Sequence, residues 1–598
     1  MRKLTLCLAI AGSTGAFGQQ GQGNLTGNIE SIFQYLREDS IIGASQPDQK
    51  GLLNSYMNVF YTNGNFRAGL RFESYLPRIQ GYPTNFNGTG IGMRYVGYGN
   101  DFVDITFGSI YEQFGSGLTL RAYEDRALGY DNMLDGARII VRPKKGFVIK
   151  GVYGYQRESF DEGRIIHSPG IVRGVDGEIH LNETFKGLAE SKLDATIGGS
   201  FVSKYQADDN SVLTLPENVG CYGGRVKLKY GKFAFDAEYV TKGQDPSRDN
   251  DTIFNHGHAA VANLSYTQKG LGILLSAKSS DNMSYRSNRS QVLQTSLINY
   301  LPALTKTHTY NLVASLYPYP TQLVGEMAYQ AEVLYTFKKG SKLGGKYGTS
   351  INANFSTAYR PMRHTSGFSA LDSTGVIYST GIFDKSDSLY WQDINFNISK
   401  KFSKNFNAVF SYFNIKLNND VATVTKEKGF IHSNIFVLEL GYKFKNKSSL
   451  RTEFQGLFVN RRDTVLNLLT NESYTEDYPF YSRKGHYVDK GDWATLVVEY
   501  TINSNWFVSI MDQYNYTGEK PPSGYGLLDI FSNADKEVLE SGAHYRQHYV
   551  YFTAGYIRGA TRITASIGKQ RAGLFCVGGV CRPVPSSNGL TLSFTHSF

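Results

Sequence analysis

The C-terminal end of the chain carries a strict alternation of side chains. Apolar or aromatic residues, with one His, fall on one face, at Leu590, Leu592, Phe594, His596 and Phe598. Hydroxyl residues fall on the other face, at Thr591, Ser593, Thr595 and Ser597. This period of two predicts a β-strand with one face toward lipid and the other toward a polar lumen.

The same alternation recurs along the chain. Residues 436–444 place Glu439, Gly441 and Lys443 on the polar face, and residues 548–556 repeat the pattern. Strands are predicted near 24–36, 51–62, 66–76, 88–98, 102–111, 136–142, 147–156, 171–181, 194–205, 219–230, 233–242, 257–268, 270–280, 291–300, 308–317, 325–337, 348–359, 389–402, 405–417, 433–444, 449–460, 492–502, 505–516, 545–558, 560–570 and 588–598. The weakest patterns are those near 171–181 and 194–205.

The connections between these strands alternate in length. Short turns occupy every second position, at 63–65, 99–101, 144–146, 231–232, 269–270, 403–404, 446–448 and 503–504. The long connections fall on the opposite side, at 112–135, 360–388, 461–491 and 517–544. The sequence therefore predicts an all-β fold, a transmembrane antiparallel β-barrel of about 24–26 strands with both termini at the periplasmic end.

Composition agrees with a barrel exported to an outer membrane. The chain has 42 Tyr, 37 Phe and 63 Gly, and beyond its first residues it has no long apolar run. Arg2 and Lys3 precede a short apolar stretch, and Ala16-Phe17-Gly18 has the small residues of a cleavage site. We expect a signal peptide over 1–18 and an outer-membrane β-barrel over 19–598, with no separate plug domain.

Charge and motifs argue against other classes of function. The net charge is +10, but the basic residues are spread over turns and loops, so we expect no nucleic-acid partner. The chain has no G-x-S-x-G, P-loop, H-E-x-x-H or C-x-x-C motif, and its 11 His are scattered. We therefore expect no enzymatic activity, no cofactor and no metal ion.

The segment 112–135 differs from an ordinary loop. Phe114, Leu118 and Leu120 need a place to be buried, while the charged residues of the segment cannot enter lipid. Both conditions are met if the segment folds into the lumen, with Gly115, Gly117, Gly129 and Gly136 supplying bends; a solvated surface loop is the alternative. The predicted lumen constriction consists of Glu112, Arg121, Tyr123, Glu124, Asp125, Arg126 and Asp131.

Two cysteines lie in the last predicted extracellular loop. In an exported protein, Cys576 and Cys581 most simply form a disulfide; a metal or redox role is the alternative. Cys221 remains alone, as a buried or wall thiol.

Two motifs resemble a known family. The block Y-E-x-F-G-x-G-L…Y-E-D-R…L-G-x-D-N at 111–132 and the F-C-V-G-G-V-C-R loop at 575–582 are similar to those of an uncharacterised outer-membrane β-barrel family of Bacteroidota, a domain of unknown function. The resemblance implies fold and location and supplies no mechanism.

Two hypotheses for function follow. An open lumen of this size would leak, so either the barrel's own loops or a partner must fill it. The first hypothesis is a channel or transport protein for a large solute or polymer; the alternative is a scaffold that holds a partner in a surface or secretion assembly. Expected partners are outer-membrane lipids, the barrel assembly machinery, which would recognise the terminal Phe598, and a plug, periplasmic or lipoprotein partner.

Overall fold

The computed structural model describes residues 23–598, apart from 366–374, 419–429, 460–490, 517–546 and 578–579. Residues 1–18, predicted as a signal peptide, lie outside the described residues. Within the described ranges, no helix is long and apolar enough to cross a membrane.

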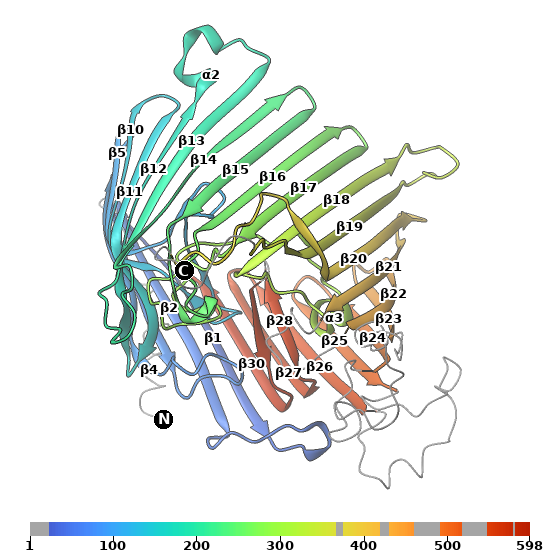
Figure 1. The fold of residues 1–598 in the computed structure, drawn as a ribbon. Coiled ribbons are helices and arrows are strands. Elements are labelled where there is room, and N and C mark those ends of the chain that lie inside the picture. The colour runs from blue at the N-terminus through green and yellow to red at the C-terminus, as the bar shows by residue number, and fades with distance from the viewer. Residues whose placement is uncertain (1–22, 366–374, 419–429, 460–490, 517–546, 578–579) are drawn as a thin grey trace, which may run out of the picture.

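The chain forms one closed barrel of 24 antiparallel strands (Figure 1). Each strand pairs with the next along the chain, and β30 pairs with β1 to close the ring. The first twelve strands are β1 (Asn24–Arg37), β2 (Gly51–Asn63), β3 (Phe66–Tyr75), β4 (Gly88–Gly99), β5 (Val103–Ile110), β10 (Leu134–Lys144), β11 (Phe147–Asp161), β12 (Arg164–His180), β13 (Leu193–Tyr205), β14 (Asn218–Tyr230), β15 (Phe233–Lys242) and β16 (Gly257–Gln268). The others are β17 (Leu271–Asp281), β18 (Gly325–Phe337), β19 (Thr349–Pro361), β20 (Lys385–Lys401), β21 (Phe406–Asn418), β22 (Phe430–Lys443), β23 (Ser449–Val459), β24 (Trp493–Thr501), β25 (Trp506–Asn515), β26 (Gln547–Arg558), β27 (Thr561–Gln570) and β30 (Ser587–Ser597).

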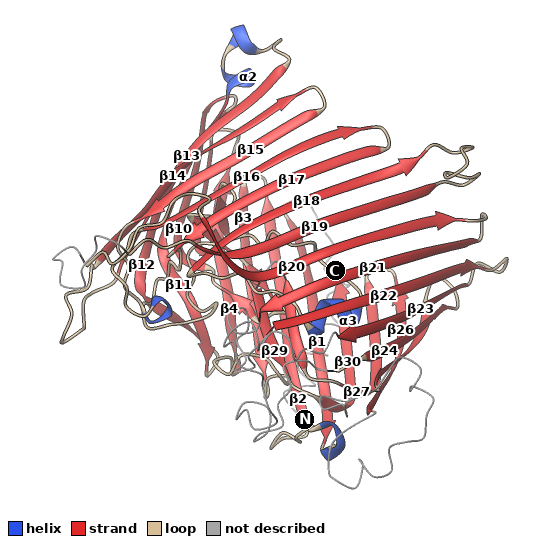
Figure 2. Cartoon of the chain, turned by 45° about the vertical axis from the view of Figure 1, so that its right-hand side comes forward, coloured by secondary structure: helices blue, strands red, loops and turns tan. Residues whose placement is uncertain are grey.

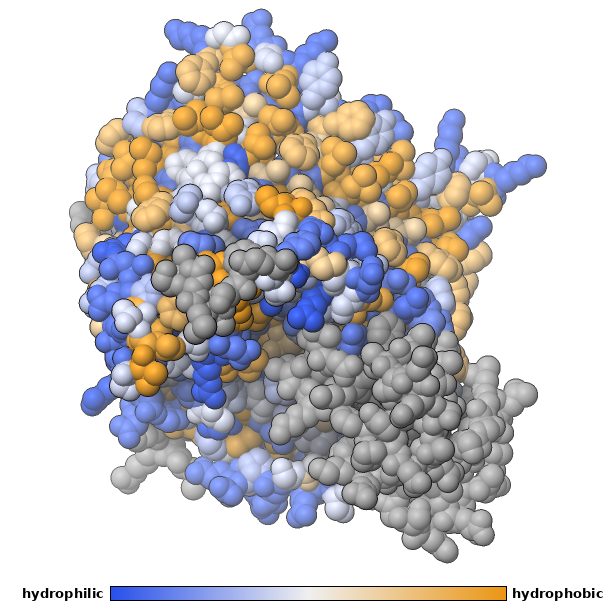
Figure 3. Space-filling model, viewed as in Figure 1, coloured by the Kyte–Doolittle hydropathy of each residue, from blue (hydrophilic) through white to orange (hydrophobic). Residues whose placement is uncertain are grey.

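The two faces of each strand differ as the alternation predicts. On β22, Phe436 and Leu438 are 42% and 39% exposed, whereas the alternate residues Ile435 and Val437 are buried on the inner side. Figure 3 shows hydrophobic residues gathered over the outer surface of β13–β19, with hydrophilic residues at the turns. An apolar outer band on a closed sheet is the surface expected where strands face lipid.

The two ends of the barrel have different connections. At the short-turn end, β14 and β15 are separated only by residues 231–232, and all eight predicted short turns lie there. This end also carries α2 (Leu181–Thr184) and the 3-10 turn η3 (Lys186–Leu188). At the loop end the connections are mostly longer, except for the tight turn 162–163 between β11 and β12. The predicted asymmetry is therefore present.

The count of 26 strands is wrong in two places. The predicted strands 291–300 and 308–317 do not join the sheet; they lie in the long connection between β17 and β18, where residues 311–316 form helix α3 (Asn311–Leu316). Because the two predicted strands that do not form are consecutive, the alternation of short turns and long loops between the remaining strands is unchanged. Both weaker predictions are strands, β12 and β13.

Adjacent residues on β21 test which face meets lipid. Phe410 points outward and is 38% exposed, whereas Val409 points into the lumen opposite Glu439. A charged side chain on the lipid face costs about 2–4 kcal/mol near the bilayer midplane. We expect Phe410→Arg to lower the free energy of unfolding in lipid vesicles by up to about this amount, and Val409→Arg to lower it much less. Equal losses would contradict the assignment of faces.

Candidate functional site: the barrel lumen

The connection between β17 and β18, residues 282–324, runs through the lumen; we call it the crossing segment. It leaves the wall after Asp281 and returns at Gly325, and these two residues are register partners on neighbouring strands. In both Figure 1 and Figure 2, helix α3 lies within the ring of strands. The crossing segment is therefore an insertion into one hairpin, and its removal would leave the strand register intact.

Three lysines of the wall hold the crossing segment. Each donates to a backbone carbonyl oxygen: Lys204 Nζ to Arg286 at 2.7 Å, Lys242 Nζ to Ser284 at 2.7 Å and Lys278 Nζ to Pro302 at 2.6 Å. All three side chains are fully buried. Lys204 and Lys242 also pair with Asp245, at 2.6 and 3.6 Å, and Lys278 pairs with Glu326 at 2.6 Å. Buried ammonium groups are thus matched by carboxylates and by carbonyl groups that have no sheet partner.

The first half of the crossing segment packs against the wall formed by β11–β16. Met283, Tyr285 and Ile298 are fully buried in a cluster with Val172, Val202 and other inward side chains. The Tyr285 hydroxyl donates to the Val219 carbonyl oxygen at 2.8 Å. Apolar contact fixes the position of this half, and the hydroxyl satisfies a wall carbonyl.

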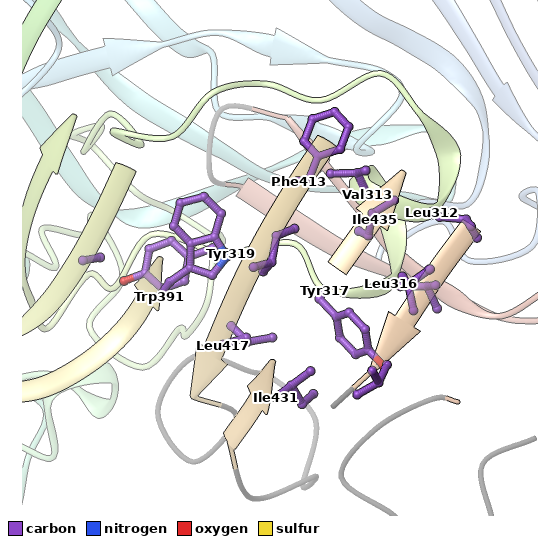
Figure 4. Packing of buried hydrophobic residues seen from close by; sticks show 14 of the residues in the cluster. Leu312, Val313, Leu316, Tyr317, Tyr319, Trp391, Phe413, Leu417, Ile431 and Ile435 are labelled. Carbon is purple, nitrogen blue, oxygen red and sulfur yellow. The ribbon is translucent and has the colours of Figure 1, made fainter. Parts of the chain in front are cut away.

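The second half packs against the opposite wall. Leu312, Val313 and Leu316 of α3 lie against inward residues of β21 and β22, including Phe413 and Ile435 (Figure 4). Polar groups fix the helix on either side: the Leu312 amide donates to Gln455 Oε1 at 3.0 Å, and Gln513 Nε2 donates to Asn311 Oδ1 at 2.6 Å. The crossing segment therefore contacts both sides of the barrel.

A second internal element is the connection between β5 and β10, residues 111–133, which we call the lumen loop. It forms two short hairpins, β6 (Glu112–Phe114) with β7 (Leu120–Ala122), and β8 (Glu124–Asp125) with β9 (Tyr130–Asp131). Phe114, Leu118 and Leu120 are fully buried against the wall. Gly115, Gly117 and Gly129 have positive φ and supply bends, whereas Gly136 lies in β10, where a Cβ would meet the Tyr153 carbonyl oxygen.

Charged residues of the lumen loop pair with the wall. Glu124 accepts two hydrogen bonds from Arg71, at 2.8 and 2.9 Å, and Arg126 bonds to Glu30 at 2.7 Å and to Glu124 at 3.0 Å. Asp131 lies 2.9 Å from Arg157, which also binds Glu73 at 2.7 Å. Burial raises the pKa of Asp131 to about 6, although Arg157 opposes the rise. These pairs satisfy charges that are enclosed between loop and wall.

The other predicted constriction residues lie in the same loop in different settings. Glu112 pairs with Lys150 at 2.7 Å, and Asp125 accepts the Leu128 amide at 3.0 Å. Arg121 lies between the rings of Tyr123 and Tyr300, 4.2 and 4.0 Å from their centroids. The structure therefore brings the seven residues together in the lumen; their effect on passage stays a prediction.

The lumen loop and the crossing segment bind each other through the backbone. The Arg121 amide donates to the Ile298 carbonyl at 2.8 Å, and the Tyr300 amide donates to the Gly117 carbonyl at 2.9 Å. Asn132 Nδ2 adds a bond to the Leu297 carbonyl at 2.8 Å. The two elements form one internal unit.

Cys576 and Cys581 form a disulfide between β28 (Gly573–Val577) and β29 (Val580–Val584). This hairpin meets both internal elements: Arg571 bonds to Ser315 Oγ at 2.5 Å, and Arg582 bonds to the Ala127 carbonyl at 2.8 Å. It therefore joins the internal unit from the loop end.

Cys221 and Phe598 lie in the wall. Cys221 is a free thiol, fully buried on β14. The Phe598 backbone exchanges two hydrogen bonds of 2.9 Å with Gly27, and its ring is 37% exposed on the outer face.

Comparison with known proteins gives a family. The whole chain, residues 1–598, matches the family described as "Family of unknown function (DUF6029)". The chain belongs to this family. No curated protein matches it.

Solved structures similar to this DUF6029 member have low identity. They include "Copper transporter OprC" (10% identity, 97% of this chain and 81% of that chain, TM-score 0.40). The siderophore receptor PirA from Pseudomonas aeruginosa has 9% identity, the same coverages and a TM-score of 0.39. The outer membrane transporter YddB from Escherichia coli has 10% identity, covers 96% of this chain and 81% of that chain, and has a TM-score of 0.37.

The crossing segment is the functional element that the sequence analysis missed. Its apolar residues were taken for strands, although the segment contains Pro302, Pro318 and Pro320. These prolines lie outside the predicted ranges 291–300 and 308–317, so the exclusion of proline from central strands gave no direct signal against either strand.

Replacement of one of the three wall lysines that bind the crossing segment tests how this segment is held. Lys204→Met leaves the buried Asp245 with only the longer contact to Lys242, and breaking a buried pair costs about 3–5 kcal/mol. We expect native-state trypsin cleavage near Arg286 and Arg289, both buried in the parent protein. Lys227→Met is the matched control, because Lys227 is a lumen-facing lysine that is 55% exposed. If K204M resists trypsin as well as the parent protein does, Lys204 is not needed to hold the crossing segment.

The hairpin disulfide has a direct chemical test. Peptides from the non-reduced protein, analysed by mass spectrometry, are expected to contain Cys576 linked to Cys581, with Cys221 as a free thiol. Recovery of Cys576 and Cys581 as unlinked thiols from freshly isolated membranes would contradict this assignment.

Proposed function

We propose that this protein is an outer-membrane channel or transport barrel for a large solute or polymer, closed at rest by its own internal segments. Two features support the location: the sheet is closed, so it leaves no unpaired edge in lipid, and its outer face is apolar. The short-turn end would face the periplasm and the loop end the cell exterior. Lipids would surround the barrel, and the barrel assembly machinery would recognise the C-terminal strand with its terminal Phe598.

The observation that carries the proposal is the attachment of the internal unit. A barrel of 24 strands encloses a lumen wider than that of the 16–18-stranded porins, which conduct water. Here the lumen loop and the crossing segment occupy it, held by apolar contacts with the wall and by hydrogen bonds and ion pairs that water can replace. A segment held in this way can be released without unfolding the wall.

In the scaffold alternative, a partner is held either in the lumen or by the loops. The internal unit occupies the lumen and meets both walls, so a lumen partner is not needed to prevent leakage. A periplasmic or lipoprotein partner at either rim is compatible with the channel and would act on its opening.

Excision of the internal segments tests the channel. Asp281 and Gly325 are register partners, as are Ile110 and Leu134, so a short Gly-Ser linker can replace 284–322 or 112–132 while the strands remain paired. We expect each excision to raise single-channel conductance in planar bilayers and to sensitise cells to large antibiotics. The double excision should have the largest effect, because each segment covers part of the lumen.

The control for this experiment is a linker of equal composition in the connection 338–348 between β18 and β19, which lies at the short-turn end of the barrel. All variants should retain the trypsin-resistant barrel. Folded double-excision barrels that conduct no more than the parent would rule out the channel and favour the scaffold.

A further inference from the structure

One face of the β6–β7 hairpin is turned away from the wall. Phe114 and Leu120 pair across the hairpin and are buried against the barrel, whereas the next pair, Gln113 and Arg121, is on the other face and is partly exposed. Arg121 therefore presents its guanidinium to the interior of the lumen.

Arg121 differs from the other arginines around the lumen loop. Arg71, Arg126, Arg138 and Arg157 each pair with a carboxylate. Among the described residues, the guanidinium of Arg121 has no hydrogen bond or ion pair; it contacts the rings of Tyr123 and Tyr300, which are nearly perpendicular to each other. Its charge is held in place and has no counterion within the described ranges.

The wall beside Arg121 adds positive charge. Asp104 pairs with Arg67 at 2.6 Å and with Arg138 at 2.8 Å, and Glu112 pairs with Arg138 at 3.4 Å and with Lys150 at 2.7 Å. Lys150 Nζ also reaches the carbonyl of Gln113, the register partner of Arg121, at 3.2 Å. With Arg121 included, this cluster contains four cations and the two carboxylates Asp104 and Glu112. Glu238, which accepts the Ser116 amide at 2.7 Å, and Asp125 are the other carboxylates near the hairpins, so the positive charge is local to the side of Lys150 and Arg138.

We propose that Arg121, held between Tyr123 and Tyr300, is the anchor of an anion-binding site in the lumen, which takes a carboxylate or phosphate group of the solute. The planar guanidinium offers parallel N–H donors that match either group. The two rings are nearly perpendicular (77°), with centroids 6.2 Å apart, so they contact the guanidinium by cation–π interaction from two different directions. The guanidinium N–H groups have no acceptor among the described residues. This inference deepens the proposed channel function. It rests on that function in one respect, namely that the bound anion is part of a transported solute.

The site is shared between the two internal elements. Tyr123 belongs to the lumen loop and Tyr300 to the crossing segment, and the Tyr300 amide bonds to Gly117 of the loop. Displacement of the crossing segment would remove one ring from Arg121. A bound anion would therefore report on, and bias, the position of the crossing segment.

Calorimetric titration of the purified full-length barrel in detergent tests the site, with citrate and inorganic phosphate as separate probes. We expect the parent protein to bind at least one probe and Arg121→Gln to lose at least tenfold in affinity. Arg121→Lys keeps the charge and should retain weaker binding. The matched control is Arg94→Gln, which removes the same charge from an arginine that lies on the outer face, 50% exposed and paired with Asp135.

Binding of citrate alone would assign a carboxylate group, and binding of phosphate alone a phosphate group. The proposal is overturned if the parent binds neither probe, or if R121Q retains parental affinity in a trypsin-resistant barrel. Tyr300→Leu provides a second variant, expected to weaken binding while every wall charge stays in place. Failure of the excised barrels to conduct would refute the channel alone, because titration does not depend on conductance.

Discussion

Fully enclosed charge in the lumen is the constraint on which the rest of the structure depends. Lys204, Lys242 and Lys278 point inward from alternate strands and have no access to water. A buried ammonium group costs several kcal/mol unless it is paired and hydrogen-bonded. The crossing segment has the opposite need, because it lies outside the sheet and its carbonyl groups require donors. Each therefore stabilises the other while the crossing segment is in place.

The lumen loop repeats this arrangement with arginine. Arg71 and Arg157 are buried in the wall at β3 and β11, and their carboxylate partners include Glu124 and Asp131 of the loop. Polar attachment suits the proposed release of this element, since water could replace the hydrogen bonds and ion pairs if the lumen opened. Apolar contacts at Phe114 and in α3 then set how much free energy the opening requires.

Much of the fold could be predicted from local patterns. Outward residues such as Phe436 and Leu438 and the short turns follow from period-two alternation and turn residues, because lipid and lumen impose opposite preferences on neighbouring positions. The crossing segment could not be recognised in this way. Leu297, Ile298 and Leu301 are buried by the lumen wall and not by sheet pairing, so a run of apolar residues there resembles a strand.

The lumen site was predictable only in part. The composition of residues 112–135 indicated an internal loop, since its charges cannot enter lipid and its apolar residues avoid water. The partners could not be predicted, because Arg71 and Glu124 are 53 residues apart and meet only when the lumen loop folds back against β3. Tyr300, which completes the ring contact on Arg121, belongs to a segment that was taken for a strand.

The exchange rates of backbone amides in the parent barrel, measured in lipid nanodiscs, test most directly whether the crossing segment is bound in the lumen. The amides of Ile298, Tyr300 and Leu312 donate to Tyr285, Gly117 and Gln455. The account predicts that these amides exchange slowly, as buried and bonded amides do, and that they lose protection in K204M before the strands do. Exchange at the rate of open loops in the parent barrel would contradict a lumen closed by its own chain.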